Sequence, residues 1–294
     1  MSRHQDYVQR ASFEIHNPHA KQLLLLLHGL GGDRNQPLRL INGWQRDDLT
    51  ILAPDLRAHG QTDQLGDADS YRLDSMADDV LALLNHLQQL HKPTYIAGIS
   101  MGAAIALRIA LRTPPNLRGL AFIRPAFSDT PYPTNLEPLI RIAPLLPLGA
   151  EGRSRYLQSD TYQLVAAASP SGAASLIDQF DKPAAAERAD RLRLIPGHTA
   201  WTTTAELQGL TAPTIVLGAD RDPVHPITLA RRWAGFLPNA IFHQVPARDE
   251  DPDSFEHETQ RLVRDHVVQT LQLDRLETRI DTVITNQPSP HLDS

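Results

Sequence analysis

Cysteine is absent from the 294 residues of this chain. Its absence excludes disulfides, structural zinc sites built on thiolates, and a cysteine nucleophile. An excess of positive charge is missing as well, because 28 Lys and Arg stand against 34 Asp and Glu and give a formal net charge of -6. We therefore expect no basic face that recruits nucleic acid.

Long hydrophobic runs are also missing. The most apolar stretch, five leucines at 23–27, is far shorter than the roughly 20 residues that cross a bilayer. The first 19 residues, MSRHQDYVQRASFEIHNPH, have no apolar core of the signal-peptide type. We therefore expect a cytoplasmic protein without a membrane partner.

What the chain does contain is a series of short apolar segments bounded by Gly, Pro and Asp. Six are predicted strands, at 22–29, 49–55, 93–100, 117–125, 212–220 and 240–246. Most are almost continuously apolar, which is typical of a parallel sheet with both faces covered. Helical patterns lie between them, at 75–90, where Ser75 and Asp78 resemble a capping box, and at 101–112. The alternation predicts an α/β fold with a mostly parallel central sheet flanked by helices.

One interval interrupts this alternation. Residues 127–210 contain no convincing buried strand and are rich in Pro, Ala and Arg. We expect a helical cap inserted over the carboxyl ends of the strands, with a separate helical domain as the alternative. Residues 1–126 and 211–275 would then form the core. Residues 276–294 would extend the last helix and end in a loose tail.

A serine between two glycines joins a predicted strand to an Ala-rich helix, in the stretch Gly98-Ile99-Ser100-Met101-Gly102. In such a G-x-S-x-G turn the serine sits on a tight bend that exposes its hydroxyl above the sheet. The glycines leave room where a Cβ would collide with the backbone, and the helix directs free N–H groups toward a developing oxyanion. The pattern favours Ser100 as a nucleophile; a plain turn with a serine cap is the alternative.

Four stretches together resemble the α/β-hydrolase superfamily: residues 24–32, 53–63, 97–110 and 211–226. The resemblance extends over about residues 20–270 and implies the α/β-hydrolase fold. It implies that the backbone N–H groups of Leu30 and Met101 form an oxyanion hole. It also implies that His28 and His59 are structural and that neither is the catalytic base.

The resemblance places a catalytic acid in the loop that follows the predicted strand near 213–218. The chemistry needs a carboxylate that holds an imidazole in one tautomer and stabilises its protonated form. Asp220 and Asp222 both lie in this loop. The family usually sets the acid directly before Pro or Gly, which favours Asp222.

The catalytic base is the clearest departure from the family pattern. Members usually carry a Gly-His pair shortly after the last strand, and the matching positions here are Asp249 and Glu250. We expect His257 to take this role from a longer loop. Asp253 and Glu256 resemble a capping box, which would place His257 in the first turn of the last helix.

Other assignments of the base stay open. His225 is close to Asp222 in sequence, His243 lies within the last predicted strand, and His198 lies in the expected cap. A further alternative is that no histidine completes the triad. Glu250 would then be a weak base, or the protein would bind a ligand without turnover.

Arg124 directly follows a predicted strand, at the edge of the sheet where such folds bind ligands. Its guanidinium is a candidate substrate-binding group for a carboxylate or phosphate. The alternative is an internal ion pair with Asp129 or with an acid of the 249–253 loop. Four aromatic residues of the expected cap would line an apolar pocket or form the cap's own core: Tyr132, Tyr156, Tyr162 and Trp201.

Taken with the resemblance, the sequence predicts a serine hydrolase that cleaves an ester or related acyl bond of a small molecule. Ser100 would attack, His257 would move the proton and Asp222 would orient it. No metal or organic cofactor is implied. The alternatives are other chemistry on the same fold, such as C–C hydrolysis, perhydrolysis or a lyase reaction, and a non-catalytic ligand-binding relative. The oligomeric state cannot be predicted from this sequence.

Overall fold

The computed structural model describes residues 3–44, 46–63, 65–112, 116–273 and 283–286. Its centre is one eight-stranded sheet with the strand order β7-β6-β5-β4-β2-β3-β1-β8. The six strands from β2 to β7 are parallel, and β1 is antiparallel to both of its neighbours, β3 and β8. The strands are β1 (Phe13–His16), β2 (Gln22–Leu27), β3 (Leu49–Pro54), β4 (Thr94–Ile99), β5 (Leu117–Ile123), β6 (Thr214–Ala219), β7 (Ala240–Val245) and β8 (Val283–Asn286).

The run of leucines in β2 is explained by its place inside this sheet. Side chains alternate between the two faces of a strand. Leu23, Leu25 and Leu27 accordingly join the hydrophobic cluster on one face, whereas Leu24 and Leu26 join the cluster on the other. A strand with helices on both sides needs apolar residues at every position, and the sequence supplies them.

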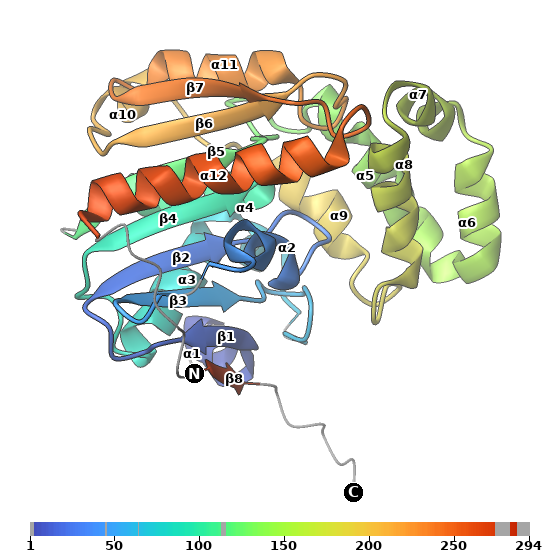
Figure 1. Cartoon of the computed structure of the whole chain (residues 1–294). Helices are drawn as coiled ribbons and strands as arrows, with labels where there is room; N and C mark the ends of the chain where they lie inside the picture. Colours follow the sequence, from blue (N-terminus) through green and yellow to red (C-terminus); the bar gives the residue numbers. More distant parts are fainter. Residues whose placement is uncertain (1–2, 45, 64, 113–115, 274–282, 287–294) are drawn as a thin grey trace, which may run out of the picture.

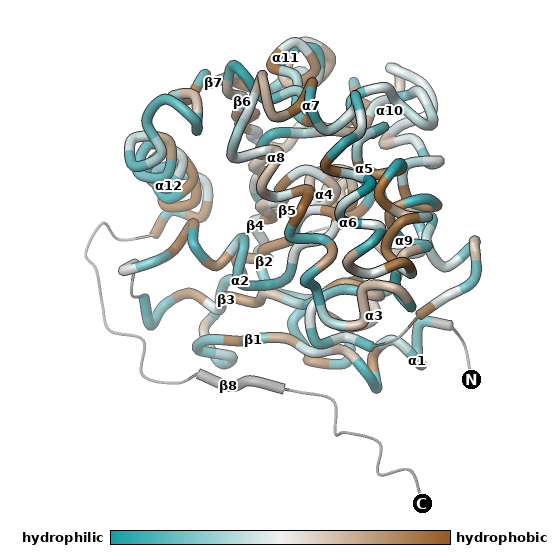
Figure 2. Tube along the Cα trace, turned by 90° about the vertical axis from the view of Figure 1, so that its right-hand side faces the viewer, coloured by the Kyte–Doolittle hydropathy of each residue, from teal (hydrophilic) through white to brown (hydrophobic). Residues whose placement is uncertain are grey.

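Helices cover both faces of the sheet (Figures 1 and 2). Residues of α1, α3, α4 and α11 belong to the cluster on one face, and residues of η1 and α12 to the cluster on the other. The α-helices are α1 (Arg3–Arg10), α2 (Asn35–Leu38), α3 (Leu73–His86), α4 (Met101–Ala110), α5 (Glu137–Ile142), α6 (Gly149–Leu157), α7 (Asp160–Ala168), α8 (Pro170–Ile177), α9 (Asp190–Leu194), α10 (Thr204–Gln208), α11 (Ile227–Phe236) and α12 (Pro252–Leu271). The 3-10 helices are η1 (Arg39–Ile41), η2 (Ala68–Tyr71), η3 (Thr134–Leu136), η4 (Ala143–Leu148), η5 (Asp178–Asp181) and η6 (Ile195–Gly197).

The described chain between β5 and β6 contains helices and no strand, from η3 to α10. We call α5 to α9, with the 3-10 helices among them, the inserted helices. Figure 1 shows them beyond the ends of the sheet strands, and in Figure 2 they lie in front of the sheet. The division of the chain into a core and a cap stays a prediction.

The predicted α/β fold with a mostly parallel sheet is confirmed, and the six predicted strands correspond to β2 through β7. The capping box expected at Ser75 and Asp78 is wrong. Helix α3 begins at Leu73, and Arg72 precedes it without a side-chain capping bond. The second capping box is wrong as well, because Asp251 and not Asp253 caps α12 and accepts a hydrogen bond from the Ser254 N–H at 2.9 Å.

The C-terminal prediction also needs correction. Helix α12 ends at Leu271, since Gln272 adopts the left-handed conformation with φ 54°. Residues 283–286 form neither helix nor loose tail but the strand β8, which pairs with the edge of β1. An unpaired β1 edge would leave a row of backbone donors and acceptors exposed. The rest of the predicted extension and tail, at 276–282 and 287–294, lies outside the described residues.

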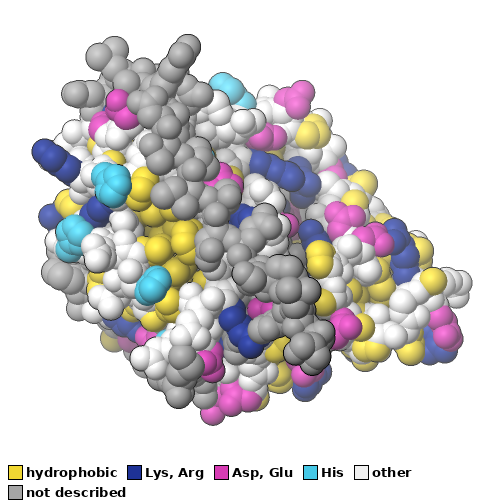
Figure 3. All heavy atoms as spheres, turned by 90° about the horizontal axis from the view of Figure 1, so that it is seen from below, with side chains coloured by type: hydrophobic (Ala, Val, Ile, Leu, Met, Phe, Trp, Pro, Cys, Tyr) yellow, Lys and Arg dark blue, Asp and Glu magenta, His cyan; other side chains and the backbone are white. Residues whose placement is uncertain are grey.

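Acidic and basic side chains are interspersed on the face shown in Figure 3. None of the helices in the described ranges combines the length and the apolar character needed to cross a membrane.

Candidate active site

Ser100 occupies the tight bend between β4 and α4. Its backbone has φ 56° and ψ -111°, a region that non-glycine residues rarely adopt and that is strained. The two glycines make the bend possible by close packing. A Cβ on Gly98 would lie 2.2 Å from the Gly102 carbonyl oxygen, and one on Gly102 would lie 2.3 Å from that of Leu27. The sequence therefore holds the serine where α4 meets the carboxyl ends of β4 and β2.

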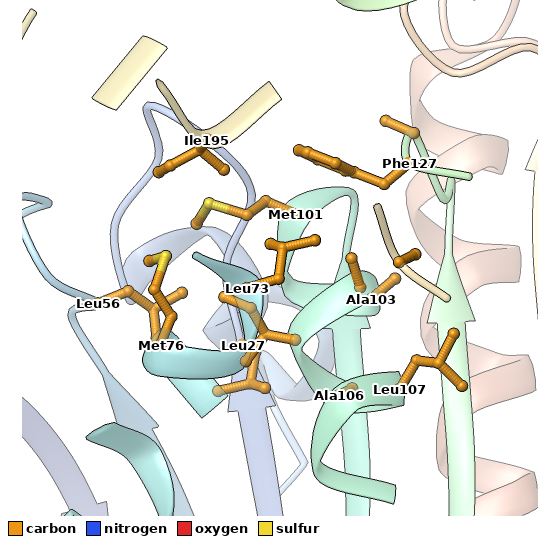
Figure 4. Close-up of a cluster of buried hydrophobic side chains, with 14 of the residues drawn as sticks. Leu27, Leu56, Leu73, Met76, Met101, Ala103, Ala106, Leu107, Phe127 and Ile195 are labelled. Atoms are coloured by element: carbon orange, nitrogen blue, oxygen red, sulfur yellow. The ribbon is translucent and has the colours of Figure 1, made fainter. Parts of the chain in front are cut away.

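The helix start beside Ser100 is fixed by packing beneath it. The Met101 side chain is fully buried. In Figure 4 it lies among side chains of α3, α4 and the chain between β5 and β6, including Met76, Phe127 and Ile195. The Met101 N–H donates no hydrogen bond to any residue that the structure describes. It is therefore free to receive negative charge next to Ser100, at the positive end of α4.

The loop after β2 supplies a second free N–H group. The Gly29 N–H donates to Gln36 Oε1 at 2.7 Å, which fixes the peptide before Leu30. The Leu30 N–H itself has no acceptor within the described part of the chain. Asp55 holds the far side of the loop, accepting from the Arg34 N–H at 2.7 Å and pairing with its guanidinium at 2.6 Å. The loop is thus positioned before any ligand binds.

A histidine completes a chain of contacts from Ser100 to an acid, and it is His225. Its Nε2 lies 3.0 Å from Ser100 Oγ, and its Nδ1 lies 2.9 Å from Asp222 Oδ2. An imidazole protonated at Nδ1 donates to the carboxylate and leaves Nε2 to accept the serine proton. The side chains of His225 and Asp222 are each 14% exposed, so the relay is largely shielded from bulk water.

The loop that carries the pair is folded by its own polar groups. The His225 N–H donates to Asp222 Oδ1 at 3.0 Å and to the Asp222 carbonyl at 3.2 Å. Such a side-chain turn is typical of aspartate in loops. Asn135, at the start of the inserted helices, donates to the Val224 carbonyl at 2.8 Å. Acid and base are therefore built on one short segment directly after β6.

Asp222 is held ionised. Burial opposes its charge, but the His225 imidazole and the Arg124 guanidinium outweigh that cost and keep the pKa of the carboxyl well below its usual range. Arg124 Nη1 lies 3.1 Å from Asp222 Oδ2, and the guanidinium carbon lies 5.5 Å from the centre of the Phe255 ring. An ionised acid at this place stabilises an imidazolium.

His257, the base predicted from the sequence, is not brought to Ser100. It is exposed on α12 and lines a separate surface depression with Trp44 and Arg261. The physical reason is helical geometry. Phe255, Glu256 and Thr259 line the cavity at Ser100. His257 follows Phe255 by two positions, about 200° around the helix, and so lies outside that face. The geometry favours His225, one of the alternatives, in place of His257.

The other candidates are placed elsewhere. His243 lies on β7, and His198 follows the 3-10 helix η6. Asp220 accepts a hydrogen bond from Gln244 at 2.6 Å, and Glu250 pairs with Arg221 at 3.0 Å. Among the described residues, none of these four side chains forms a hydrogen bond with Ser100 or His225.

Two histidines that the resemblance marks as structural are buried near the loop after β2. His28 Nε2 accepts from the Leu56 N–H at 3.0 Å, and its Nδ1 lies 2.8 Å from the Gly29 carbonyl oxygen. Burial lowers the pKa of both His28 and His59. Both therefore stay neutral. His28 ties the loops after β2 and β3 together, and the centre of the His59 ring lies 5.0 Å from that of His28.

For Arg124 and for two of the aromatic residues the structure favours the internal alternatives left open from the sequence. Arg124 is paired internally, but with Asp222 and not with Asp129 or an acid of 249–253; Asp129 pairs with Arg232. The four aromatic residues named from the sequence do not line the cavity at Ser100. Tyr156 and Trp201 are fully buried in the hydrophobic cluster, and Tyr132 is 58% exposed.

A cavity of about 440 Å³ opens above the serine, a size suited to a small molecule. The sequence analysis missed two of its polar residues, Gln179 and Arg248. Gln179 comes from η5, and its Nε2 donates to the Gly31 carbonyl at 3.4 Å while its buried Oε1 has no partner in the described chain. Arg248 lies in the loop after β7. It directly precedes Asp249 and Glu250, the positions that match the family's Gly-His pair, and no motif in the sequence indicated it.

The described residues contain no cluster of three or more His, Asp or Glu side chains suited to hold a metal ion. A buried serine–imidazole–carboxylate chain beside two free N–H groups is an arrangement that can transfer an acyl group without a metal ligand set.

Two known proteins illustrate what this chain is similar to in sequence. A relative from Variovorax paradoxus (strain S110) is 27% identical over 237 residues, which cover 80% of this chain and 86% of the relative; it is named RutD and is only provisionally assigned as a carbamate hydrolase. Lipase 3 of Moraxella sp. (strain TA144) is 30% identical over 115 residues, 39% of this chain and 35% of the lipase.

Solved structures share the fold. A thermophilic esterase from Thermogutta terrifontis superposes with a TM-score of 0.65 at 22% identity, covering 88% of this chain and 93% of the esterase. MenH from S. aureus superposes with a TM-score of 0.66 at 18% identity, covering 89% of this chain and 99% of MenH. The family described as alpha/beta hydrolase fold matches residues 22–257, and the chain belongs to this family of hydrolase-type enzymes.

Proposed function

We propose that the protein is a serine hydrolase that cleaves an ester or related acyl bond of a small molecule. The observation that carries the proposal is the pair of contacts at His225, 3.0 Å to Ser100 Oγ and 2.9 Å to Asp222 Oδ2. Both are within the range expected for a nucleophile, its base and the orienting acid. The alternative of a ligand-binding protein without a base was based on the absence of the usual histidine. The position of His225 next to Ser100 argues against this alternative.

The proposed reaction begins with proton transfer from Ser100 Oγ to His225 Nε2 as the oxygen attacks the acyl carbon. The carbonyl oxygen becomes negatively charged and is stabilised by the N–H groups of Leu30 and Met101. Collapse of this intermediate breaks the bond to the leaving group, which takes the proton from His225. Water, deprotonated by the same nitrogen, then attacks the acyl-serine and releases the acid.

The test is covalent labelling with a fluorophosphonate, which reacts readily only with an activated serine, together with hydrolysis of 4-nitrophenyl acetate. Wild-type protein is expected to take up one label at Ser100, and Ser100→Ala none. Ser175→Ala is the matched control, because Ser175 lines the same cavity but its hydroxyl donates to the Ser171 carbonyl at 2.9 Å. This control should label like the wild type. Folded wild-type protein that neither labels nor hydrolyses the ester would refute the proposed function.

A further inference from the structure

A charged side chain without a partner lines the cavity at Ser100. Arg248 is half-buried in the loop after β7 and lines the cavity together with Ser100 and His225. Within the described part of the chain its guanidinium makes no hydrogen bond and no ion pair. A partly desolvated charge without a partner is costly, so a structure that keeps one at a cavity wall indicates a ligand.

The acids near Arg248 form no hydrogen bond or ion pair with it in the described chain, because their oxygens accept from other groups. Asp249 accepts from Ser169 Oγ at 2.5 Å and from the Ser171 N–H at 2.7 Å, which ties the loop to the start of α8. Asp222 is bound by His225 and Arg124. Each carboxylate thus accepts from other donors, and the N–H groups of Arg248 remain available to a ligand in the cavity.

Other cations add to the positive charge at this wall. Burial lowers the pKa of the Arg248 guanidinium, and the nearby charge of Arg124 lowers it further; the charges of Asp222 and Asp249 offset part of this, and Arg39 has a smaller lowering effect. Arg39 is exposed at the cavity. A guanidinium remains protonated at neutral pH and binds planar oxyanions through two parallel N–H donors.

We propose that Arg248 binds a carboxylate of the substrate, so that the enzyme acts on an ester or related acyl compound that also carries an acid group. The cleaved bond rests on the proposed hydrolase function, whereas binding of the anion does not. A carboxylate fits better than a phosphate because the half-buried guanidinium of Arg248 matches one negative charge, whereas Arg39 at the same wall is exposed to solvent. Exposed acids on the same wall, Asp220 and Glu256, would repel a dianion.

Two isosteric esters test the proposal on the full-length protein. Monomethyl succinate carries a carboxylate where methyl 4-methylpentanoate carries an isopropyl group, and hydrolysis of both is followed by proton release. Arg248→Gln is expected to lower kcat/KM for the anionic ester at least about tenfold, mainly through KM, since a hydrogen bond to a charged group contributes about 1.5–3 kcal/mol. The neutral ester should change less than about twofold, and Arg248→Lys should recover part of the loss.

The matched control is Arg221→Gln. Arg221 also lines the cavity, but it is exposed and already paired with Glu250, so the preference for the anionic ester should persist. An equal loss on both esters in Arg248→Gln, or no loss, would overturn the carboxylate site. Inhibition of 4-nitrophenyl acetate turnover by inorganic phosphate but not by succinate would overturn the choice of carboxylate.

The two proposals fail separately. If Ser100 does not label but the protein binds succinate by calorimetry and Arg248→Gln abolishes that binding, the anion site stands and the hydrolase function falls. If Ser100 labels and the neutral ester is hydrolysed while Arg248→Gln leaves the anionic ester unaffected, the hydrolase stands and the anion site falls.

Discussion

His225 Nδ1 lies 2.9 Å from Asp222 Oδ2, and only two residues separate the base from the acid in the chain. Both sit in one loop after β6, whose backbone is turned by the same carboxylate. Acid and base can therefore be positioned by a single short segment. The loop after β7 therefore does not need to supply the catalytic histidine, and it contributes Arg248 to the cavity.

The first prediction separates the two histidines. His225→Gln removes the proton acceptor beside Ser100, and we expect kcat/KM for 4-nitrophenyl acetate to fall by about 10²- to 10⁴-fold. His257→Gln changes an exposed residue outside the cavity and should stay within about twofold of the wild type. Steady-state kinetics with melting curves for both variants provide the measurement. Loss of activity in His257→Gln alone would restore the assignment made from the sequence.

The second prediction concerns Arg124, which touches Asp222 and packs on Phe255. Arg124→Met keeps most of the apolar packing and removes the charge that helps to hold the acid. We expect kcat to fall about tenfold on neutral and anionic esters alike, because a hydrogen bond to a charged group contributes about 1.5–3 kcal/mol. The ratio of kcat/KM for the two esters should not change.

A selective rise of KM for the anionic ester in Arg124→Met would contradict this positioning role. It would return Arg124 to the substrate-binding role predicted from the sequence. Because the variant also leaves a buried carboxylate with fewer partners, its melting temperature should be measured first, and the kinetics compared at a temperature where it is fully folded.

The third prediction tests the packing of the serine bend. Gly102→Ala places a Cβ 2.3 Å from the Leu27 carbonyl oxygen, a rigid backbone atom. We expect a loss of about 1–3 kcal/mol in the free energy of unfolding and slower labelling of Ser100, since α4 must move away from β2. Gly235→Ala is the control, because a Cβ at this position in α11 meets open space. It should be neutral or slightly stabilising.

Most of the fold follows from local pattern in the sequence. Strands such as β2 are apolar at every position because both faces are covered, and this signal does not depend on distant parts of the chain. Strand β8 could not be predicted in the same way. Its four residues form a strand by pairing with β1, about 270 positions earlier, and long-range pairing leaves no local pattern.

The candidate site was predictable where its geometry is local. Ser100 and the Met101 N–H beside it belong to one strand–turn–helix unit, so the motif indicates them directly. The base was misassigned because spacing after β7 was given more weight than spacing after Asp222. A histidine three residues from the acid in a proline-bounded loop was the available signal for His225. That Arg248 has no partner within the described residues could not be predicted at all. It depends on the hydrogen bonds that Asp249 already accepts from Ser169 and Ser171.

The last prediction concerns stability in acid and rests on His266 of α12. Its Nδ1 lies 2.6 Å from the hydroxyl of Tyr95 on β4, a fully buried residue. Burial, with a smaller effect from His243, lowers the pKa of His266 to about 4 from a usual value of 6.5. A neutral imidazole can accept the tyrosine proton, whereas an imidazolium at this place would lose that bond and be poorly solvated.

The sign of the pH dependence follows from proton binding. Between pH 6.5 and 4 the unfolded chain protonates this histidine and the folded chain does not, so stability falls as the pH is lowered through this window. The full shift corresponds to about 3 kcal/mol, and because His266 is only partly buried the loss from it is smaller than this upper bound. In urea unfolding at several pH values between 7.5 and 4.5, His266→Gln should flatten the dependence of stability on pH, because glutamine can accept a hydrogen bond from Tyr95 without titrating.

The control is Thr270→Val, one helical turn away, where the wild-type hydroxyl donates to the His266 carbonyl. This variant should shift stability equally at every pH. A His266→Gln variant that keeps the wild-type slope would show that other buried histidines, such as His28 and His59, account for it.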